Sequence, residues 1–316
     1  MKKIRLLSLI LALALVLTLA VTAFAAEEPS PEPSGEPSGP ATEDPLAPMT
    51  FPDDVKIVSA TMYSGYTKKP DSPQDAVLKA TLYWDLTNDK VYAIRFVQPM
   101  LPWDDNEPNA GWACVNDEEL LGALGDALVT FQANVRGTDT DISFAKYLQI
   151  GGVVWTGELG RDPAADPAVI YTGEVDGETV VLGEFVRTPE GGEWYVDAAL
   201  EDVYFLTGPE PAEDASAPNV AKTYQITYKE NNGHGVFFWL SDILFPGNMQ
   251  AIKDFVTENG FGYDYYADGG ITKNEDGYWQ TADAVSGATL DETPTYLDVL
   301  KTLYNEIQAG NYVEEN

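Results

Sequence analysis

The sequence is poor in the residues that most hydrolases and zinc proteins use. Its 316 residues include one cysteine, Cys114, and one histidine, His234. An intrachain disulfide and a zinc site built from cysteine and histidine are therefore excluded. A serine–histidine–aspartate hydrolase would have to use His234, which lies in the stretch "NNGHG". That stretch is typical of a hairpin turn, so we expect His234 to be an exposed turn residue.

Positive charge is scarce as well. The chain has 18 basic and 51 acidic residues, which gives a net charge of −33. Such a surface repels nucleic acid and anionic lipid, so we expect no nucleic-acid partner. With so many carboxylates, no pair can be singled out as the two acids of a glycosidase. The acidic stretches Asp139–Asp141 and 104–107 lack the glycine and distal glutamate of an EF-hand, so we predict no metal site and no catalytic residue in this chain.

The N-terminus has the pattern of a secretory signal. Three basic residues precede a long apolar run that ends in "AFA", an A-x-A cleavage site at Ala25. Removal of residues 1–25 would give a secreted or extracytoplasmic protein, whereas an uncleaved segment would anchor it in the membrane. Residues 26–48 are rich in Pro, Ser and Glu, and we predict a disordered stalk because they offer too few apolar residues for a core.

The remaining chain predicts an α+β fold with twisted antiparallel sheets and a few packing helices. Residues 49–207 form a predicted β-rich domain, 208–219 a linker or long loop, and 220–316 a C-terminal domain. The predicted strands share apolar alternation between turn residues, and they are "AVLKATLYWDL", "KVYAIRFVQ", "VVWTGEL", "AVIYTGEV", "ETVVLGEFV", "EWYVDAALEDVYFL", "KTYQITYKE" and "GVFFWL".

Four helices are predicted from apolar residues at helical spacing. The first is capped by Asn116 and continues to Val135, and a short second one covers 144–149. The third begins at Asn248 and is stopped by Gly260. The last is capped by Thr293, opens with Pro294, and presents one apolar face, formed by Tyr296, Leu297, Leu300, Leu303, Tyr304 and Ile307.

The stretch "DAVSGAT", Asp283–Thr289, stands shortly before that last helix. One interpretation is a structural turn, in which Gly287 permits a positive φ and Ser286 bonds to nearby backbone. The helix already has a cap at Thr293, so these hydroxyls are not needed for capping. Small residues at Gly287 and Ala288 would also let a bulky group approach Thr289 closely.

The same seven residues resemble the signature D-[GA]-x-[ST]-G-A-T of FMN-binding domains. Such domains occur in subunits of the sodium-pumping NADH:quinone oxidoreductase, in Rnf electron-transfer complexes and in secreted bacterial flavoproteins. In that family an extracytoplasmic flavin transferase, using FAD and a divalent metal, joins FMN through its phosphate to the last threonine, which matches Thr289. The resemblance covers roughly residues 222–308 and departs after the signature, where Leu290-Asp291-Glu292 stands in place of T-x-T-S.

The resemblance implies an exported electron carrier with covalent FMN. Thr289 would be the attachment point, and Asp283, Ser286, Gly287 and Ala288 would shape the turn that binds the cofactor. The implied partners are the flavin transferase and a redox partner, which could be membrane-bound. The flavin ring would need flat apolar walls, and the nearest aromatic residues are Tyr263, Tyr265, Tyr266, Tyr278 and Trp279. Two alternatives stay open: an unmodified surface or ligand-binding module on the same scaffold, and a flavin-dependent extracellular reductase.

Overall fold

The computed structural model describes residues 46–66, 76–103, 111–135, 138–160, 169–228, 244–262, 272–273, 279–280 and 293–316. The chain divides into two compact units, Met1–Ala41 and Thr42–Asn316, and every described residue belongs to the second unit. The predicted signal and nearly all of the predicted stalk lie outside the described residues. Among the helices that are described, none is long and apolar enough to cross a membrane.

A four-stranded antiparallel sheet has the strand order β14-β1-β2-β3. Its strands are β1 (Ile57–Tyr66), β2 (Ala76–Asp85), β3 (Lys90–Val97) and β14 (Val313–Glu314). Because side chains alternate between faces along a strand, every second residue of β1 and β2 points to one apolar face. On that face Val58 and Leu82 are fully buried, whereas Thr61 and Thr81 on the opposite face share a hydrogen bond of 2.9 Å between their hydroxyls.

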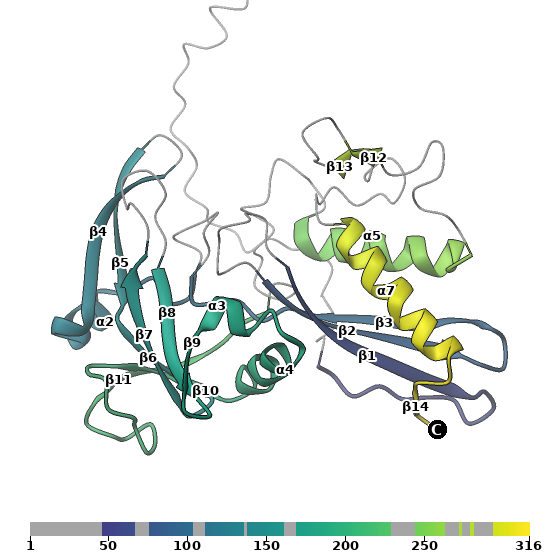
Figure 1. The fold of residues 1–316 in the computed structure, drawn as a ribbon, viewed down its shortest axis with the longest axis horizontal. Helices are drawn as coiled ribbons and strands as arrows, with labels where there is room; N and C mark the ends of the chain where they lie inside the picture. The colour runs from purple at the N-terminus through teal and green to yellow at the C-terminus, as the bar shows by residue number, and fades with distance from the viewer. Residues whose placement is uncertain are drawn as a thin grey trace, which may run out of the picture. The chain divides into compact units, whose positions relative to one another are not determined.

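Two helices, α5 (Leu244–Asn259) and α7 (Thr293–Gln308), pack on the apolar face of this sheet (Figure 1). The sheet and the two helices enclose one of two hydrophobic cores, which we call the second core. Its buried side chains come from the sheet, from both helices and from the residues just after α5: Val58, Ala60, Leu78, Ala80, Leu82, Trp84, Val91, Ile94, Phe96, Met249, Ile252, Phe255, Val256, Phe261, Tyr296, Leu297, Val299, Leu300, Leu303 and Ile307. The predicted apolar face of the last helix is confirmed. Helix α5 begins four residues earlier than predicted, and Gly260, with φ of +64°, follows its last residue as expected.

The predicted hairpin at residues 76–98 is confirmed by β2 and β3. Asp85 sits at the start of the turn and accepts hydrogen bonds from the backbone N–H groups of Thr87 (2.9 Å) and Asn88 (3.0 Å), and from the Asn88 amide (2.6 Å). Burial pushes the pKa of Asp85 up, but the hydrogen bonds from Asn88 and Thr87 outweigh it, and the pKa lies below its ordinary value. Asp89 adopts φ of 52°, a left-handed conformation that aspartate tolerates in turns.

A six-stranded antiparallel sheet has the order β11-β10-β6-β7-β8-β9. Its strands are β6 (Tyr147–Ile150), β7 (Val153–Leu159), β8 (Val169–Val175), β9 (Glu178–Val181), β10 (Asp202–Leu206) and β11 (Val220–Gln225). Gly173 lies opposite Trp155 in the β7–β8 pair, and a Cβ atom on it would stand 2.8 Å from the Trp155 ring. The sheet thus needs a glycine there to accommodate a fully buried indole.

The other hydrophobic core, which we call the first core, lies between this six-stranded sheet, four short helical elements and a two-stranded ribbon. They are α2 (Glu118–Leu124), the 3₁₀ turn η1 (Gly125–Ala127), α3 (Leu182–Phe185), α4 (Pro189–Ala198), β4 (Leu128–Val135) and β5 (Thr138–Ala145). Large buried aromatic residues dominate this core, among them Trp103, Trp155, Tyr171 and Tyr195.

The helix predicted from residue 116 to Val135 is wrong beyond its first two turns. Asp117, not Asn116, caps α2 by accepting hydrogen bonds from Glu119 and Leu120. Gly125, with φ of 53°, follows the last helical residue, and β4 then pairs with β5 over its whole length. The short helix predicted at 144–149 is also wrong, because β5 extends to Ala145 and β6 begins at Tyr147.

The stretch "EWYVDAALEDVYFL" is not one strand, as predicted, but the end of a helix followed by β10. Thr188 caps α4 by accepting a hydrogen bond from the Gly191 N–H (3.0 Å), and Pro189 opens the helix. In "ETVVLGEFV" only the first four residues form a strand, β9, and α3 follows. Two further short strands, β12 (Thr272–Lys273) and β13 (Trp279–Gln280), pair with each other.

The predicted linker at 208–219 connects β10 to β11, which are antiparallel neighbours. The Gln149 side chain holds this loop: its amide donates to the Ala212 carbonyl (3.0 Å) and accepts from the Ala212 N–H (2.7 Å). The division of the chain into two domains at this loop stays a prediction. The general prediction of an α+β fold, with antiparallel sheets and a few helices, is confirmed.

Candidate functional site

The predicted attachment motif, Asp283–Thr289, lies outside the described residues. So do His234, the acidic stretch at 104–107, and the aromatic residues Tyr263, Tyr265, Tyr266 and Tyr278. The described elements that bracket the motif are β13, which ends at Gln280, and α7, which begins at Thr293. The structure therefore describes the two elements that flank the motif in sequence, β13 and α7.

The first turn of α7 is joined to the end of β3 by a buried polar pair. The Tyr296 hydroxyl lies 2.8 Å from Gln98 Nε2, which donates to it, and 3.1 Å from Gln98 Oε1, to which it donates. Both residues are fully buried, and the Tyr296 ring also meets Phe96 edge-on, with ring centroids 5.3 Å apart. Thr289 stands four residues before α7, and Tyr296 follows it by seven residues.

A second group of polar contacts involves the backbone directly after Gln98. Pro99 forms a backbone bridge with Tyr228, and the Met100 N–H donates to the Thr227 carbonyl at 2.9 Å. The Met100 carbonyl accepts from the Tyr195 hydroxyl (2.7 Å) and from Trp112 Nε1 (3.0 Å). Burial raises the pKa of Tyr195 far above its ordinary range, so this hydroxyl remains a donor at all physiological pH values.

An aromatic group lies farther along α7, formed by Trp84, Phe261 and Tyr304. Phe261 and Tyr304 are stacked with ring centroids 4.7 Å apart, and Trp84 lies 5.0 Å from Tyr304. Tyr304 is about three turns beyond Thr293, or about 16 Å along the helix axis. This aromatic group belongs to the second core, where it packs between α7 and the sheet. Trp84 Nε1 is buried and has no hydrogen-bond partner among the described residues.

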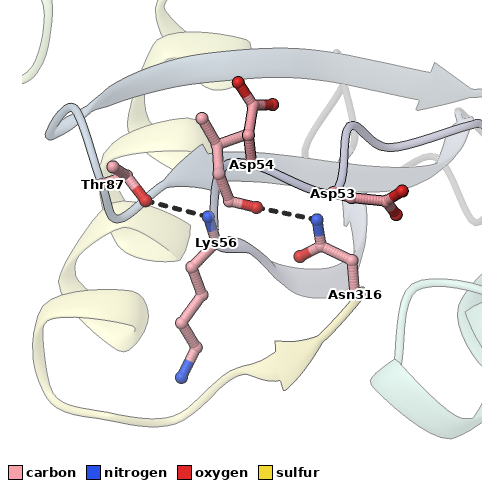
Figure 2. Close-up of a pocket in the computed structure, with 6 residues that line it drawn as sticks. Asp53, Asp54, Lys56, Thr87 and Asn316 are labelled. Carbon is pink, nitrogen blue, oxygen red and sulfur yellow. Dashed lines mark hydrogen bonds between the residues drawn. The ribbon is translucent and has the colours of Figure 1, made fainter.

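A polar pocket of about 380 Å³ lies where the ends of the described chain meet, and it is lined by Asp53, Asp54, Val55, Lys56, Thr87 and Asn316. Figure 2 shows the Asp53 and Asp54 carboxylates pointing in different directions, so they do not converge on a common point. The Asn316 amide donates to the Val55 carbonyl at 2.8 Å, and the Lys56 N–H donates to the Thr87 hydroxyl at 2.9 Å.

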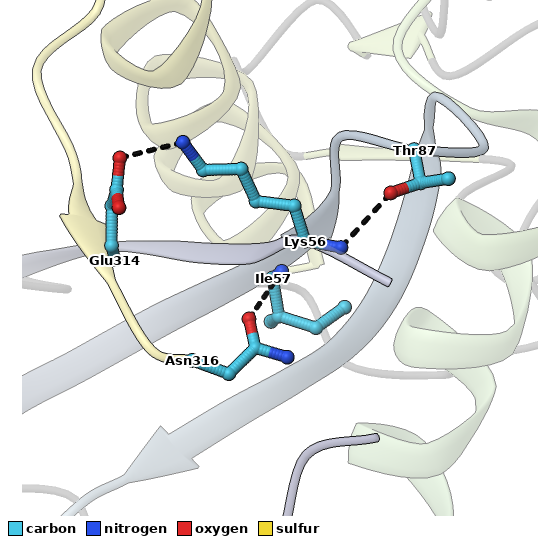
Figure 3. A network of polar contacts seen from close by, with 5 residues as sticks. All are labelled: Lys56, Ile57, Thr87, Glu314 and Asn316. Atoms are coloured by element: carbon cyan, nitrogen blue, oxygen red, sulfur yellow. Dashed lines mark hydrogen bonds and ion pairs between the residues drawn. The ribbon is translucent and has the colours of Figure 1, made fainter. Parts of the chain in front are cut away.

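The polar contacts beside this pocket attach β14 to the sheet (Figure 3). The Lys56 ammonium and the Glu314 carboxylate form an ion pair of 2.6 Å, and the Ile57 N–H donates to Asn316 Oδ1 at 2.9 Å. The hydrogen bond to Glu314 raises the pKa of Lys56. The pocket has no aromatic wall, and its contacts fasten two chain segments together, so we assign it a structural role.

No metal centre is present in the described part of the chain. No group of three histidine, cysteine, aspartate or glutamate side chains there could hold an ion. Asp139 and Asp141 lie in β5, where they pair with β4 instead of forming a loop. Cys114 is half-buried and forms no disulfide, and its backbone forms a bridge with Phe144.

Comparisons of the chain with protein-family models, curated proteins and solved structures give no significant match. No relative therefore supplies an activity, a ligand or a set of site residues. Any functional assignment depends on the residues themselves and on the framework around them.

Proposed function

We infer that this chain is an exported flavoprotein, which carries FMN covalently on Thr289 and passes electrons between partners outside the cytoplasm. The observation that carries the proposal is the signature "DAVSGAT" at Asp283–Thr289. The finer fold assignment, an FMN-binding-domain-like C-terminal part, belongs to the same proposal. The secretory pattern of residues 1–25 supports it, because the family's flavin transferase works outside the cytoplasm.

The residue types of the motif are compatible with attachment of FMN through its phosphate. A threonine hydroxyl is a poor nucleophile until a base or metal activates it, and here the transferase would supply that activation. The Thr289 hydroxyl would lose its proton and form an Oγ–P bond to the FMN phosphate of FAD, while the pyrophosphate bond of FAD breaks and AMP leaves. Asp283 and Ser286 would hold the turn, and Gly287 and Ala288 would leave room for the approach. Once bound, the flavin would supply one- and two-electron transfer.

The described framework contributes a fixed helix shortly after the acceptor. Helix α7 begins four residues beyond Thr289 and is buried along one face of the second core. The free N–H groups and the dipole of a helix start favour an anionic group nearby. Pro294 removes one of those N–H groups, so the remaining ones of the first turn would have to serve.

One sequence feature favours a second candidate, an unmodified surface or ligand-binding module. The family continues T-x-T-S after the signature, whereas this chain has Leu290-Asp291-Glu292. Two carboxylates close to a phosphate diester would repel it. In the module interpretation, the motif is a structural turn and Thr289 stays unmodified.

Co-expression with an extracytoplasmic flavin transferase separates the two candidates. The carrier predicts a band on a denaturing gel that fluoresces under ultraviolet light, and a mass increase of one FMN less one water. Thr289→Val keeps the volume but removes the hydroxyl, so the fluorescence should vanish. Thr302→Val is the matched control, because Thr302 is an exposed α7 residue whose hydroxyl donates only locally, to the Asp298 carbonyl. Asp283→Ala should impair labelling.

A colourless wild-type protein in the presence of active transferase would refute the carrier and favour the unmodified module. Retention of flavin by Thr289→Val would place the attachment elsewhere and reduce the motif to a turn.

A further inference from the structure

Helices α5 and α7 pack on one face of the four-stranded sheet, and the opposite face is polar in its middle (Figure 1). The register places the side chains of this polar face in three rows across β1, β2 and β3: Tyr63, Lys79 and Val97; Thr61, Thr81 and Arg95; and Ser59, Tyr83 and Ala93. We call the middle row together with Lys79 the hydroxyl–cation patch. Thr61 is exposed, and Lys79 and Arg95 are half-buried, so the patch is open to solvent.

The patch holds two positive charges that have no acidic partner. Lys79 and Arg95 are diagonal neighbours on β2 and β3, and such side chains lie about 7–8 Å apart. Neither forms an ion pair with a carboxylate of the described residues, although the chain has 51 acidic residues. Instead, Lys79 Nζ lies 5.5 Å from the centroid of the Tyr63 ring, and Arg95 interacts with the Tyr83 hydroxyl. Like charges at this separation repel each other, and an anion from outside the chain would offset that repulsion.

The same patch offers hydrogen-bond donors. The Thr61 and Thr81 hydroxyls lie 2.9 Å apart, and only one of their two protons is used in the bond between them. When Thr81 donates, the exposed Thr61 hydroxyl can direct its own proton to a ligand. The Arg95 guanidinium carries N–H groups in a planar fork that matches a carboxylate, and the Lys79 ammonium is a flexible point charge. These donors suit carboxylate oxygens.

The surroundings limit the ligand to a small one. At one end of the polar face Tyr63 packs against the first core, and at the other Phe51 lies against Tyr83, with ring centroids 5.6 Å apart. Glu315, which accepts from the Ser59 hydroxyl at 2.5 Å, adds a negative charge at this second end. Three strands and three rows span about 10 by 14 Å, whereas a stable protein partner buries about 800 Å² on each side. A polyanion would be repelled by the net charge of −33.

We propose that the hydroxyl–cation patch is a binding site for a small organic dicarboxylate. One carboxylate would accept the guanidinium fork of Arg95 and the available proton of the threonine pair. The second carboxylate would accept from the Lys79 ammonium, whose flexible stem adjusts to the length of the ligand. The site does not involve the flavin, so it stands or falls independently of the proposed carrier function.

The test titrates the chain from residue 26 onward with succinate at low ionic strength, by calorimetry and by amide chemical shifts. We expect a dissociation constant of about 1 mM, with shifts centred on the amides of residues 59–63, 77–83 and 93–97. Arg95→Gln and Lys79→Gln each remove one charge and should each weaken binding about tenfold. The matched control is Lys222→Gln, which removes the same charge from an exposed ion pair with Asp117 in the other sheet and should stay within about twofold of wild type. Circular dichroism confirms that each variant is folded.

Acetate and inorganic phosphate test the chemical class of the ligand. Acetate has only one carboxylate and should bind about tenfold more weakly than succinate, because it leaves one cation unpaired. Acetate or phosphate that binds as tightly as succinate would overturn the assignment to a dicarboxylate.

The absence of any shift at about 20 mM succinate would overturn the site itself. An equal loss of binding in Lys222→Gln would do so as well, because the effect would then be one of net charge. If Arg95→Gln fails to fold, Lys79→Gln decides.

Discussion

Replacing Gln149 by alanine should release the loop that joins β10 to β11. Gln149 and Ala212 are both about 8% exposed, and the glutamine amide makes two hydrogen bonds to the Ala212 backbone. The side chain thus makes the two backbone hydrogen bonds that a neighbouring strand would make. Without it, the Ala212 N–H and carbonyl lose their partners while still buried.

The size of the effect follows from these two bonds. A lost hydrogen bond that leaves a buried partner unsatisfied costs about 1–3 kcal/mol. Two such groups, partly relieved if the loop moves toward water, predict a loss of about 2–4 kcal/mol in the free energy of unfolding. Urea denaturation measures this directly, and with an m-value of about 3 kcal/mol/M the midpoint should fall by about 1 M. The control is Gln225→Ala, which loses only an exposed 3.3 Å contact to the Leu200 carbonyl and should stay within about 0.5 kcal/mol of wild type.

A second variant, Gln149→Glu, should have a free energy of unfolding that depends on pH. Gln149→Glu would place a carboxylate oxygen against the Ala212 carbonyl, so burial and repulsion would raise its pKa in the folded state. An acid whose folded pKa is raised destabilises above its unfolded pKa of about 4.3, and the penalty grows as the pH rises toward the folded value. The protonated acid can still donate to Ala212, so Gln149→Glu should approach wild-type stability near pH 4 and lose it at pH 7.

Limited proteolysis provides the structural readout for the same variants. Gln149→Ala should be cut within residues 208–219 faster than wild type, because the loop backbone is no longer held. A stability loss below about 0.5 kcal/mol together with unchanged cleavage would refute this account. It would mean that other contacts hold the loop, such as the bond from the Asn219 amide to the Glu210 carbonyl (2.7 Å).

Three further outcomes are expected. Leu300→Ala should lower the free energy of unfolding by about 2–5 kcal/mol in urea titrations, because Leu300 is fully buried in the second core. Gly173→Val should destabilise the fold by about 1–3 kcal/mol or more, since its Cβ would meet the Trp155 ring at 2.8 Å, and the indole fluorescence should shift as the ring is displaced. Asp85→Ala should cost about 1–2 kcal/mol at pH 7; because the folded pKa of Asp85 is lowered, this difference should shrink as the pH falls below about 4, and denaturation at pH 7 and pH 3 checks it.

Where local pattern and tertiary environment agree, the sequence predicts the structure well. The β2–β3 hairpin follows from strict alternation around "TNDK", and α7 follows from apolar residues at helical spacing after a Thr-Pro start. Residues 128–135 show the opposite case. Their apolar residues continue the helical spacing of α2, yet Phe131 and Ala133 also alternate, and pairing with β5 makes the strand the better solution.

The α4 error has a local cause. The aromatic and β-branched residues of "EWYV" suggest a strand, but Thr188 and Pro189 just before them are a helix start, and that signal was available in the sequence. The Gln98–Tyr296 pair is different. Tyr296 was predicted on an apolar face, but its partner lies 198 residues away, and no local pattern identifies a contact at that separation. In the sequence, this contact is marked by a single glutamine after a run of apolar strand residues.

The pairing of β14 with β1 has a consequence for the order in which the protein can fold. Val58 lies opposite Glu314, and the ion pair beside them joins residues 258 positions apart, so the four-stranded sheet includes segments made at very different times. In a chain exported N-terminus first, as proposed, β1 would emerge long before β14. Until residues 313–316 arrive, Val58 and Ser59 lack their β14 partners, and this end of the β1 edge can pair with the edge of another chain. Contacts of such long sequence separation also form slowly, because a large loop must close first. Between the emergence of β1 and of β14, this end of the sheet edge is therefore open to pairing with another chain.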